Sequence, residues 1–204
     1  MASYSVYLSK SYKITFSKLF SVLIFSLIFS KFSIASPIPV VAPDAQHIFG
    51  LINDRLSYME KVALFKNNTH KAVEDLGREK IVLEKTLSTV TDLGLNPESI
   101  SGFIQAQMDA AKAIQYRYRA QWLSIPPQTQ RDIDLQGEVR PRLIELGKEI
   151  MVSISQYLKA GGRFQPEQME EFIDSLKVNN LSTVDKKNIF KSLLKIEKGA
   201  GSLK

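Results

Sequence analysis

The sequence contains no cysteine, so it can form no disulfide framework. It also lacks low-complexity tracts, internal repeats, a glycine-rich phosphate loop and any long strand-like alternation of apolar and polar residues. Its 204 residues, 44% of them hydrophobic, are enough for one domain with a sizeable core, or for one domain and a short appendage. The stability of that domain must therefore come from packing alone.

Residues for the common kinds of covalent and metal catalysis are also scarce. The only two histidines, His47 and His70, have no arrangement of serine or cysteine around them that predicts a nucleophile–base pair. No spacing of histidine, aspartate and glutamate resembles a metal site. We therefore expect neither a covalent nucleophile nor a bound metal.

The first 35 residues differ in composition from the rest. They contain four lysines and no acidic residue. The apolar run Leu19–Ser30 is too short to span a bilayer, which takes about 20 residues, and the small residues Ser33 and Ala35 follow it. This order is typical of a secretory signal peptide (residues 1–35) cleaved after Ala35, with an uncleaved N-terminal anchor as the alternative. Both interpretations place the working domain outside the cytosol, in the periplasm or secreted, with membrane contact only through this segment.

The formal charge of +6 belongs largely to this leader. Without its four lysines, 23 basic and 21 acidic residues remain, a net charge of +2. A nucleic-acid-binding domain should keep a basic face after this subtraction, and none is evident. We therefore expect no nucleic-acid partner.

The remainder predicts an all-α domain over residues 44–204, preceded by a proline-rich lead-in at 36–43. Asp44 and the pair Asn96-Pro97 are helix start signals, and Pro141 fits the first turn of a later helix. Together with apolar periodicity, these signals predict helices over about 44–66, 70–90, 97–123, 140–160, 166–178 and 184–197, with 131–139 as a loop or short turn. Six helices with short connections indicate a six-helix bundle.

Charged residues fall on the inward rows of these predicted helices. Arg55 lies on the apolar row of the first helix, and Lys66 follows eleven residues later. Eleven steps of 100° end about 20° from the starting direction, so both cations point the same way. On the second helix, Asp75, Arg78 and Glu79 form an i, i+3, i+4 row.

Two further polar residues join this set. Gln115 lies on the apolar stripe of the third helix, and Arg140 lies at a helix N-terminus, where free N–H groups favour anions. Taken singly, each residue fits an ordinary role as an edge side chain, a surface ion pair or a satisfied amide. Together they leave excess positive charge in the interior, which is costly unless an anion binds. The sequence therefore predicts a pocket for a small di-acid.

These segments resemble the all-helical, AroQ-type chorismate mutases, most closely their exported gamma subclass. The resemblance covers residues 45–150 and rests on RLSYMEKVALFK, EDLGRE, FIQAQMDAAKAIQYRYRAQW and VRPRLIELG. The arginine–eleven–lysine spacing, followed by Asp-x-x-Arg-Glu and a glutamine-bearing helix, is specific in combination. Residues 160–204 add only a helical tail of the kind that exported members have.

The resemblance implies an isomerase that converts chorismate to prephenate, a step of the shikimate pathway, by an intramolecular Claisen rearrangement without cofactor or metal. Arg55, Arg78 and Arg140 would hold the two carboxylates of chorismate, since guanidinium groups bind carboxylates through two hydrogen bonds. Lys66 and Gln115 would donate to the ether oxygen, where negative charge develops. The implied catalytic residues are thus Lys66, Gln115 and Arg78.

Two carboxylates also have implied roles, and one position differs from the pattern of the family. Glu79 would bind the ring hydroxyl, and Asp75 would line the same end of the pocket and orient its neighbours. Ala111 stands where relatives often have a serine or threonine that bonds the substrate, so it is left out of the site. Gln115 stands where some relatives have glutamate, and an amide needs no protonation to donate.

The resemblance also implies a homodimer in which each pocket is built within one chain, Arg140 supplying a cation that shorter forms borrow from a partner. Two alternatives remain open at the level of sequence. One is a related isochorismate pyruvate lyase with a similar helical pocket. The other is a non-catalytic exported helical domain that binds anions.

Overall fold

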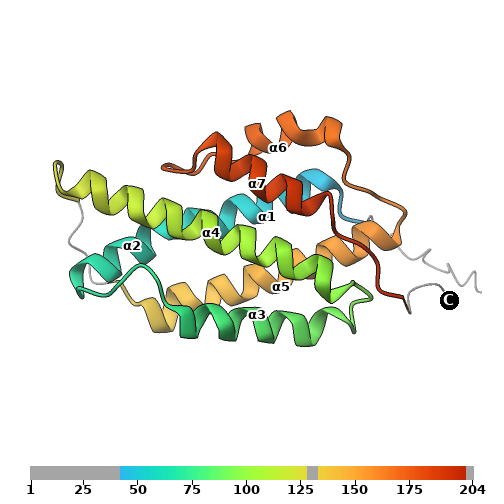
Figure 1. Ribbon diagram of the computed structural model, residues 1–204, viewed down its shortest axis with the longest axis horizontal. Coiled ribbons are helices and arrows are strands. Elements are labelled where there is room, and N and C mark those ends of the chain that lie inside the picture. The colour runs from blue at the N-terminus through green and yellow to red at the C-terminus, as the bar shows by residue number, and fades with distance from the viewer. Residues whose placement is uncertain (1–41, 128–132, 201–204) are drawn as a thin grey trace, which may run out of the picture. The chain divides into compact units, whose positions relative to one another are not determined.

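The computed structural model describes residues 42–127 and 133–200, which belong to one compact unit. The predicted signal peptide and most of the proline-rich lead-in lie outside these residues. The elements in chain order are α1 (Ala45–Ser57), α2 (Met59–Asn68), α3 (Leu76–Val90), α4 (Pro97–Trp122), the π-helical turn η1 (Leu135–Val139), α5 (Arg140–Lys159), the 3-10 turn η2 (Pro166–Gln168), α6 (Met169–Ser175) and α7 (Thr183–Leu193) (Figure 1).

The all-α class is confirmed. Within the described ranges there is no strand, only one isolated bridge between Leu95 and Lys198. Helices α1 and α2 are two halves of the first predicted helix, interrupted at Tyr58 alone, so the bundle has the six helices expected. In the same ranges, no helix combines the length and the apolar character needed to cross a membrane.

The predicted start signals act as expected. The side chain of Asp44 accepts the N–H of His47 at 2.8 Å and caps α1. Asn96 accepts the N–H groups of Glu98 and Ser99, and Pro97 is the first residue of α4. Capping oxygens satisfy N–H groups that have no partner inside the helix.

The predicted start of the second helix was wrong. We expected the helix from His70, whereas α3 begins at Leu76. His70 has a φ of 52°, in the left-handed region that ends a helix. The true cap is Asp75, which accepts the N–H of Arg78 at 3.0 Å.

The other differences lie at helix ends. The last two helices end earlier than predicted, at Ser175 and Leu193. After Leu193 the chain pairs with the α3–α4 turn instead, because Asn96 donates to Glu197 and Gly199 donates to Gly94. The described part of the predicted 131–139 loop consists of two residues without regular structure and the turn η1, which runs directly into α5.

Helix α4 is central to the packing. It packs against α2, α3 and α7, while α1 packs against α5 and α6 (Figure 1). Phe49, Phe172 and Phe190 join α1, α6 and α7 in an aromatic cluster, with ring centroids 5.0–6.2 Å apart. In α3, by contrast, only Val90 is buried. The inner side of α3 is therefore free to form the wall of a cavity.

Candidate active site

A cavity of about 620 Å³ lies among α1–α5 and η1. Its lining includes every site residue predicted from the sequence, namely Arg55, Lys66, Asp75, Arg78, Glu79, Gln115 and Arg140. These residues come from five helices: Arg55 and Lys66 lie near the ends of α1 and α2, Asp75, Arg78 and Glu79 at the start of α3, Gln115 on α4, and Arg140 at the start of α5. The fold thus brings the whole predicted set to one place.

The four cations of this set have no ion-pair partner in the part of the chain that the structure describes. Among the described residues, none of Arg55, Lys66, Arg78 and Arg140 has a carboxylate within salt-bridge distance. Nη1 of Arg55 is buried and has no hydrogen-bond partner. Burial lowers the pKa of Arg55 to about 10. A buried cation without an anion is unfavourable, so this end of the cavity favours an anionic ligand.

Lys66 is half-buried at the end of α2. Its Nζ donates to the carbonyl of Val73 in the loop before α3, which leaves two of its three N–H groups for a ligand. Burial lowers the pKa of Lys66, with Arg119 and Arg140 lowering it further and Asp75 and Glu79 opposing them. The net effect is a lowered pKa, so Lys66 loses its proton more readily than an ordinary lysine does.

The two carboxylates are already engaged. Asp75 caps α3 through its bond to the N–H of Arg78. Glu79 accepts from Nζ of Lys112 at 3.0 Å, and Lys112 also approaches Asp109 at 3.4 Å. Because Glu79 is paired with Lys112, it leaves the four cations largely uncompensated.

Gln115 is buried, 5% exposed, with its amide only partly satisfied. Nε2 donates to the carbonyl of Ala111 at 3.0 Å and contacts the sulfur of Met59 at 3.7 Å, while Oε1 has no partner. A thioether is a weak acceptor. One N–H of Gln115 can therefore turn from Met59 to a ligand at little cost.

Sequence reasoning missed two residues of this region. Lys112 lines the cavity and holds Glu79, yet it lies one position beyond the apolar stripe. Arg119 donates to the carbonyls of Lys66 and Lys71 at 3.1 and 2.7 Å and so fixes the end of α2. Periodicity alone gave no signal for Arg119, because its partners are backbone carbonyls about fifty residues away.

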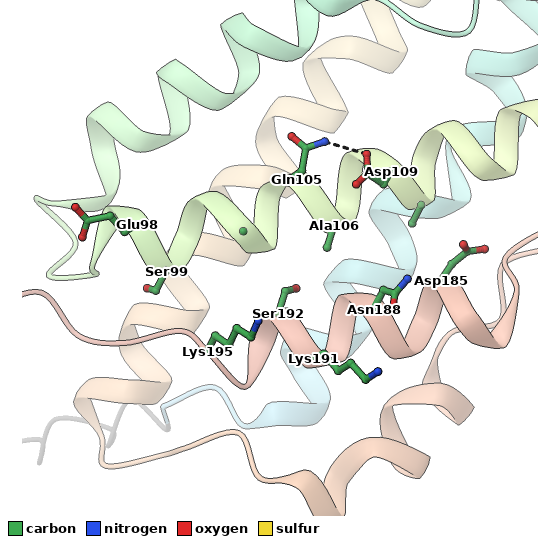
Figure 2. Close-up of a pocket in the computed structure, with 12 residues that line it drawn as sticks. Glu98, Ser99, Gln105, Ala106, Asp109, Asp185, Asn188, Lys191, Ser192 and Lys195 are labelled. Carbon is green, nitrogen blue, oxygen red and sulfur yellow. Dashed lines mark hydrogen bonds between the residues drawn. The ribbon is translucent and has the colours of Figure 1, made fainter.

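A second cavity, about 550 Å³, lies between α4 and α7 (Figure 2). Its lysines, Lys191 and Lys195, share the surface with acids such as Glu98 and Asp109. None of the buried unpaired polar atoms belongs to its lining. It therefore lacks the charge excess and the unsatisfied groups that mark the first cavity.

The first cavity can orient a small dianion and stabilise charge that develops on it. Several fixed donors surround the ligand from five helices, which restricts it to one conformer. Preorganised N–H groups of Lys66 and Gln115 can stabilise an oxygen that gains negative charge. Among the described residues, no group of three or more His, Asp or Glu side chains is placed to hold a metal ion.

Comparison with known proteins agrees with this chemistry. The family described as chorismate mutase type II matches residues 45–116. The chain is 39% identical over 147 residues to a monofunctional chorismate mutase from Enterobacter agglomerans, across 72% of this chain and 80% of that protein. It is 38% identical over 147 residues to a secreted chorismate mutase from Yersinia pestis, across 72% of this chain and 78% of that protein.

A crystal structure of the secreted chorismate mutase from Yersinia pestis superimposes with a TM-score of 0.68 at 37% identity, over 74% of this chain and 97% of that one. The similarity therefore extends past the 45–116 match and includes most of the helical bundle. The chain belongs to the chorismate mutase family.

Proposed function

We propose that the cationic cavity binds chorismate and converts it to prephenate by an intramolecular rearrangement. One observation carries the proposal: four cations that have no counter-ion among the described residues line the same cavity as the half-satisfied amide of Gln115. Chorismate supplies two carboxylates for the cations and an ether oxygen for the donors. Its binding would remove the electrostatic cost of the empty site.

Arg55, Arg78 and Arg140 hold the two carboxylates in this proposal. Their guanidinium groups reach the cavity from the end of α1, the first turn of α3 and the start of α5. Two-point hydrogen bonds from fixed directions hold the substrate in the compact conformer that the rearrangement requires.

Lys66 and Gln115 donate to the ether oxygen as its bond to carbon breaks. Charge on that oxygen is largest in the transition state, so these donors accelerate the reaction more than they tighten substrate binding. Glu79 accepts the ring hydroxyl through the carboxylate oxygen that Lys112 leaves free. Asp75 acts by fixing the start of α3, and with it Arg78.

An Arg78→Ala variant tests the proposal. Loss of a bidentate carboxylate contact should lower kcat/KM for chorismate about a hundredfold or more. Arg142→Ala is the matched control, because Arg142 is paired with Glu145 and Glu149 on α5 and does not line the cavity. Unchanged prephenate formation by Arg78→Ala would overturn the assignment, and pyruvate release from isochorismate would favour the lyase alternative.

We propose in addition that the enzyme is exported and cleaved after Ala35, and that it forms a homodimer. The leader composition and the secreted relative support export, and the family resemblance supports the dimer. A mature N-terminus at Ser36 and a dimeric mass in solution are the expected results. An intact leader in the exported protein, or a monomer, would contradict the respective part.

A further inference from the structure

The cavity continues beyond its cationic end, along α3, α4 and α5. Ser155 on α5 donates to the carbonyl of Leu93 in the α3–α4 turn, so these three helices meet again at the other end. We call this part of the cavity the distal half; its apolar lining residues are Val82, Leu93, Ile104, Met108, Met151 and Val152. Lys85, Asp92 and Lys148 also line it but are exposed, and therefore lie toward its rim.

One buried polar side chain belongs to this half and has no role in the proposed reaction. Gln107 on α4 lines the cavity, is only 2% exposed, and has no hydrogen-bond partner for Oε1. Thr86, which lines the same cavity, gives it no bond, because its hydroxyl donates to the carbonyl of Val82 on its own helix. Buried polar groups are nearly always paired, so an unpaired amide in the wall of a cavity indicates a missing ligand group.

The position of Gln107 separates it from the cations. It lies one turn before Ala111 and two turns before Gln115 on α4, toward the α3–α4 turn. Eight residues correspond to about 12 Å along a helix. Ala111, which lies between the two amides on α4 and also lines the cavity, has only a methyl side chain.

We propose that the distal half is a subsite for an aromatic ring that carries a hydroxyl, on a molecule whose carboxylate lies at the cationic end. The apolar walls and the thioethers of Met108 and Met151 suit an aromatic ring. The hydroxyl bonds the amide of Gln107, which accepts through Oε1 or, after rotation of its terminal bond, donates through Nε2. The place of the carboxylate depends on the anion site of the proposed function, whereas the places of the ring and the hydroxyl depend on the distal half alone.

Two probes that differ by one hydroxyl test the subsite. Calorimetry would measure the Kd of 3-(4-hydroxyphenyl)propanoate and of 3-phenylpropanoate for the full enzyme. We expect the hydroxylated acid to bind about tenfold more tightly, the usual effect of one hydrogen bond to a buried amide. Both acids should inhibit chorismate turnover competitively, because they share the carboxylate site.

Variants at Gln107 make the test specific. Gln107→Met and Gln107→Leu should fold normally, since each replaces an unsatisfied amide by an apolar side chain in an apolar wall, and should abolish the preference for the hydroxyl. Gln105→Met is the matched control, because Gln105 is exposed on the other side of α4, where it bonds Asp109 (Figure 2). The control should keep the tenfold preference.

The outcomes separate this proposal from the proposed function. Equal affinity for the two acids in the unsubstituted enzyme, or a preference that survives in Gln107→Met, would overturn the subsite and leave the mutase assignment intact. A large loss of kcat/KM for chorismate in Gln107→Met would also overturn it, because Gln107 would then belong to the substrate site. If the unsubstituted enzyme neither binds the aryl acids nor has mutase activity, the anion site itself would be overturned.

Discussion

Arg55 is a charged side chain that the protein interior leaves without a counter-ion. Its Nη1 has no partner among the described residues, and burial lowers its pKa to about 10. Such a group destabilises a free-standing core but forms strong two-point bonds with a carboxylate. Arg55 therefore favours ligand binding and lowers the stability of the empty enzyme.

An Arg55→Met variant should separate these two effects. The free energy of unfolding in urea should rise by about 1 kcal/mol, because an unpaired buried charge is replaced by an apolar side chain. At the same time kcat/KM for chorismate should fall about a hundredfold or more. Arg142→Met, at a half-buried arginine that is paired on its own helix, should leave kcat/KM unchanged. A markedly less stable Arg55→Met protein would show that Arg55 is structural.

Lys66 should set the alkaline limit of activity. Burial lowers its pKa, so the free enzyme loses this charge at a lower pH than an ordinary lysine would. A bound dianion favours the charged form and raises the pKa again. In initial rates of chorismate loss, the alkaline limb of kcat/KM, which reports the free enzyme, should therefore lie below that of kcat, which reports the complex.

On the acid side of the same pH–rate profile we expect no corresponding decrease. Gln115 needs no proton to donate, so the rate should not fall steeply between pH 5 and 7.5. A steep fall in this interval would mean that a carboxyl group acts as the donor. Coincident alkaline limbs for kcat and kcat/KM would rule out Lys66 as the group that titrates.

At the scale of elements, the loop between α2 and α3 shows what local sequence patterns miss. The start of α4 was predictable because Asn96 and Pro97 act within their own first turn. The segment from His70 to Asp75 is not helical: His70 has a φ of 52°, and Arg119 on a distant helix bonds the carbonyls of Lys66 and Lys71. Contacts over such separations leave no periodic signal.

The residues of the site also divide into those set by a single helix and those set by contacts between helices. Rows on single helices predicted Arg55, Lys66, Arg78 and Gln115, because helical geometry alone makes them face inward. The pairing of Lys112 with Glu79 joins residues 33 positions apart and depends on how α3 packs on α4. Tertiary packing, which single-helix periodicity does not encode, decides such contacts.

Arg119→Met tests the loop that joins α2 to α3. Without the contacts to Lys66 and Lys71, the amino group of Lys66 should be less well placed, and kcat should fall about tenfold. Because the charge of Arg119 lowers the pKa of Lys66, the alkaline limb of kcat/KM should also move to higher pH.

Arg119→Lys separates position from charge. It keeps the positive charge, but its side chain is shorter and lacks the Nη2 that makes both bonds, so kcat should fall while the alkaline limb stays in place. A merely structural arginine would lower stability in both variants without moving the limb. Unchanged kcat in Arg119→Met would contradict the positioning role.

At the scale of the whole molecule, positive charge is concentrated rather than general. The chain without its predicted leader carries a net charge of only +2, yet the cavity is lined by the four cations of the predicted site, none of them ion-paired within the described residues, and by Lys85 and Lys148 at its rim. One wall of that cavity is α3, which packs mainly on α4 and buries only Val90. The empty enzyme therefore combines electrostatic repulsion with a weakly held wall, and a dianion should relieve both.

An unreactive cyclic dicarboxylate that mimics the bicyclic transition state should stabilise the folded enzyme. At a concentration of 100 Kd, mass action predicts an increase of about 2.7 kcal/mol in the free energy of unfolding, provided that the ligand binds only the folded state. Urea denaturation with and without the ligand measures this increase. It should be largely absent in Arg55→Met and Arg78→Ala, and smaller for the matching monocarboxylate.

Hydrogen exchange locates the effect. Amides of α3 (Leu76–Val90) should exchange faster than those of α4 in the empty enzyme, because few of their side chains are buried. The dicarboxylate should slow exchange most strongly in α3, since Arg78 and Glu79 tie that helix to the ligand. Protection confined to α7 would instead place the ligand in the groove between α4 and α7 (Figure 2). The cationic cavity would then not be the binding site, whatever the activity of the enzyme.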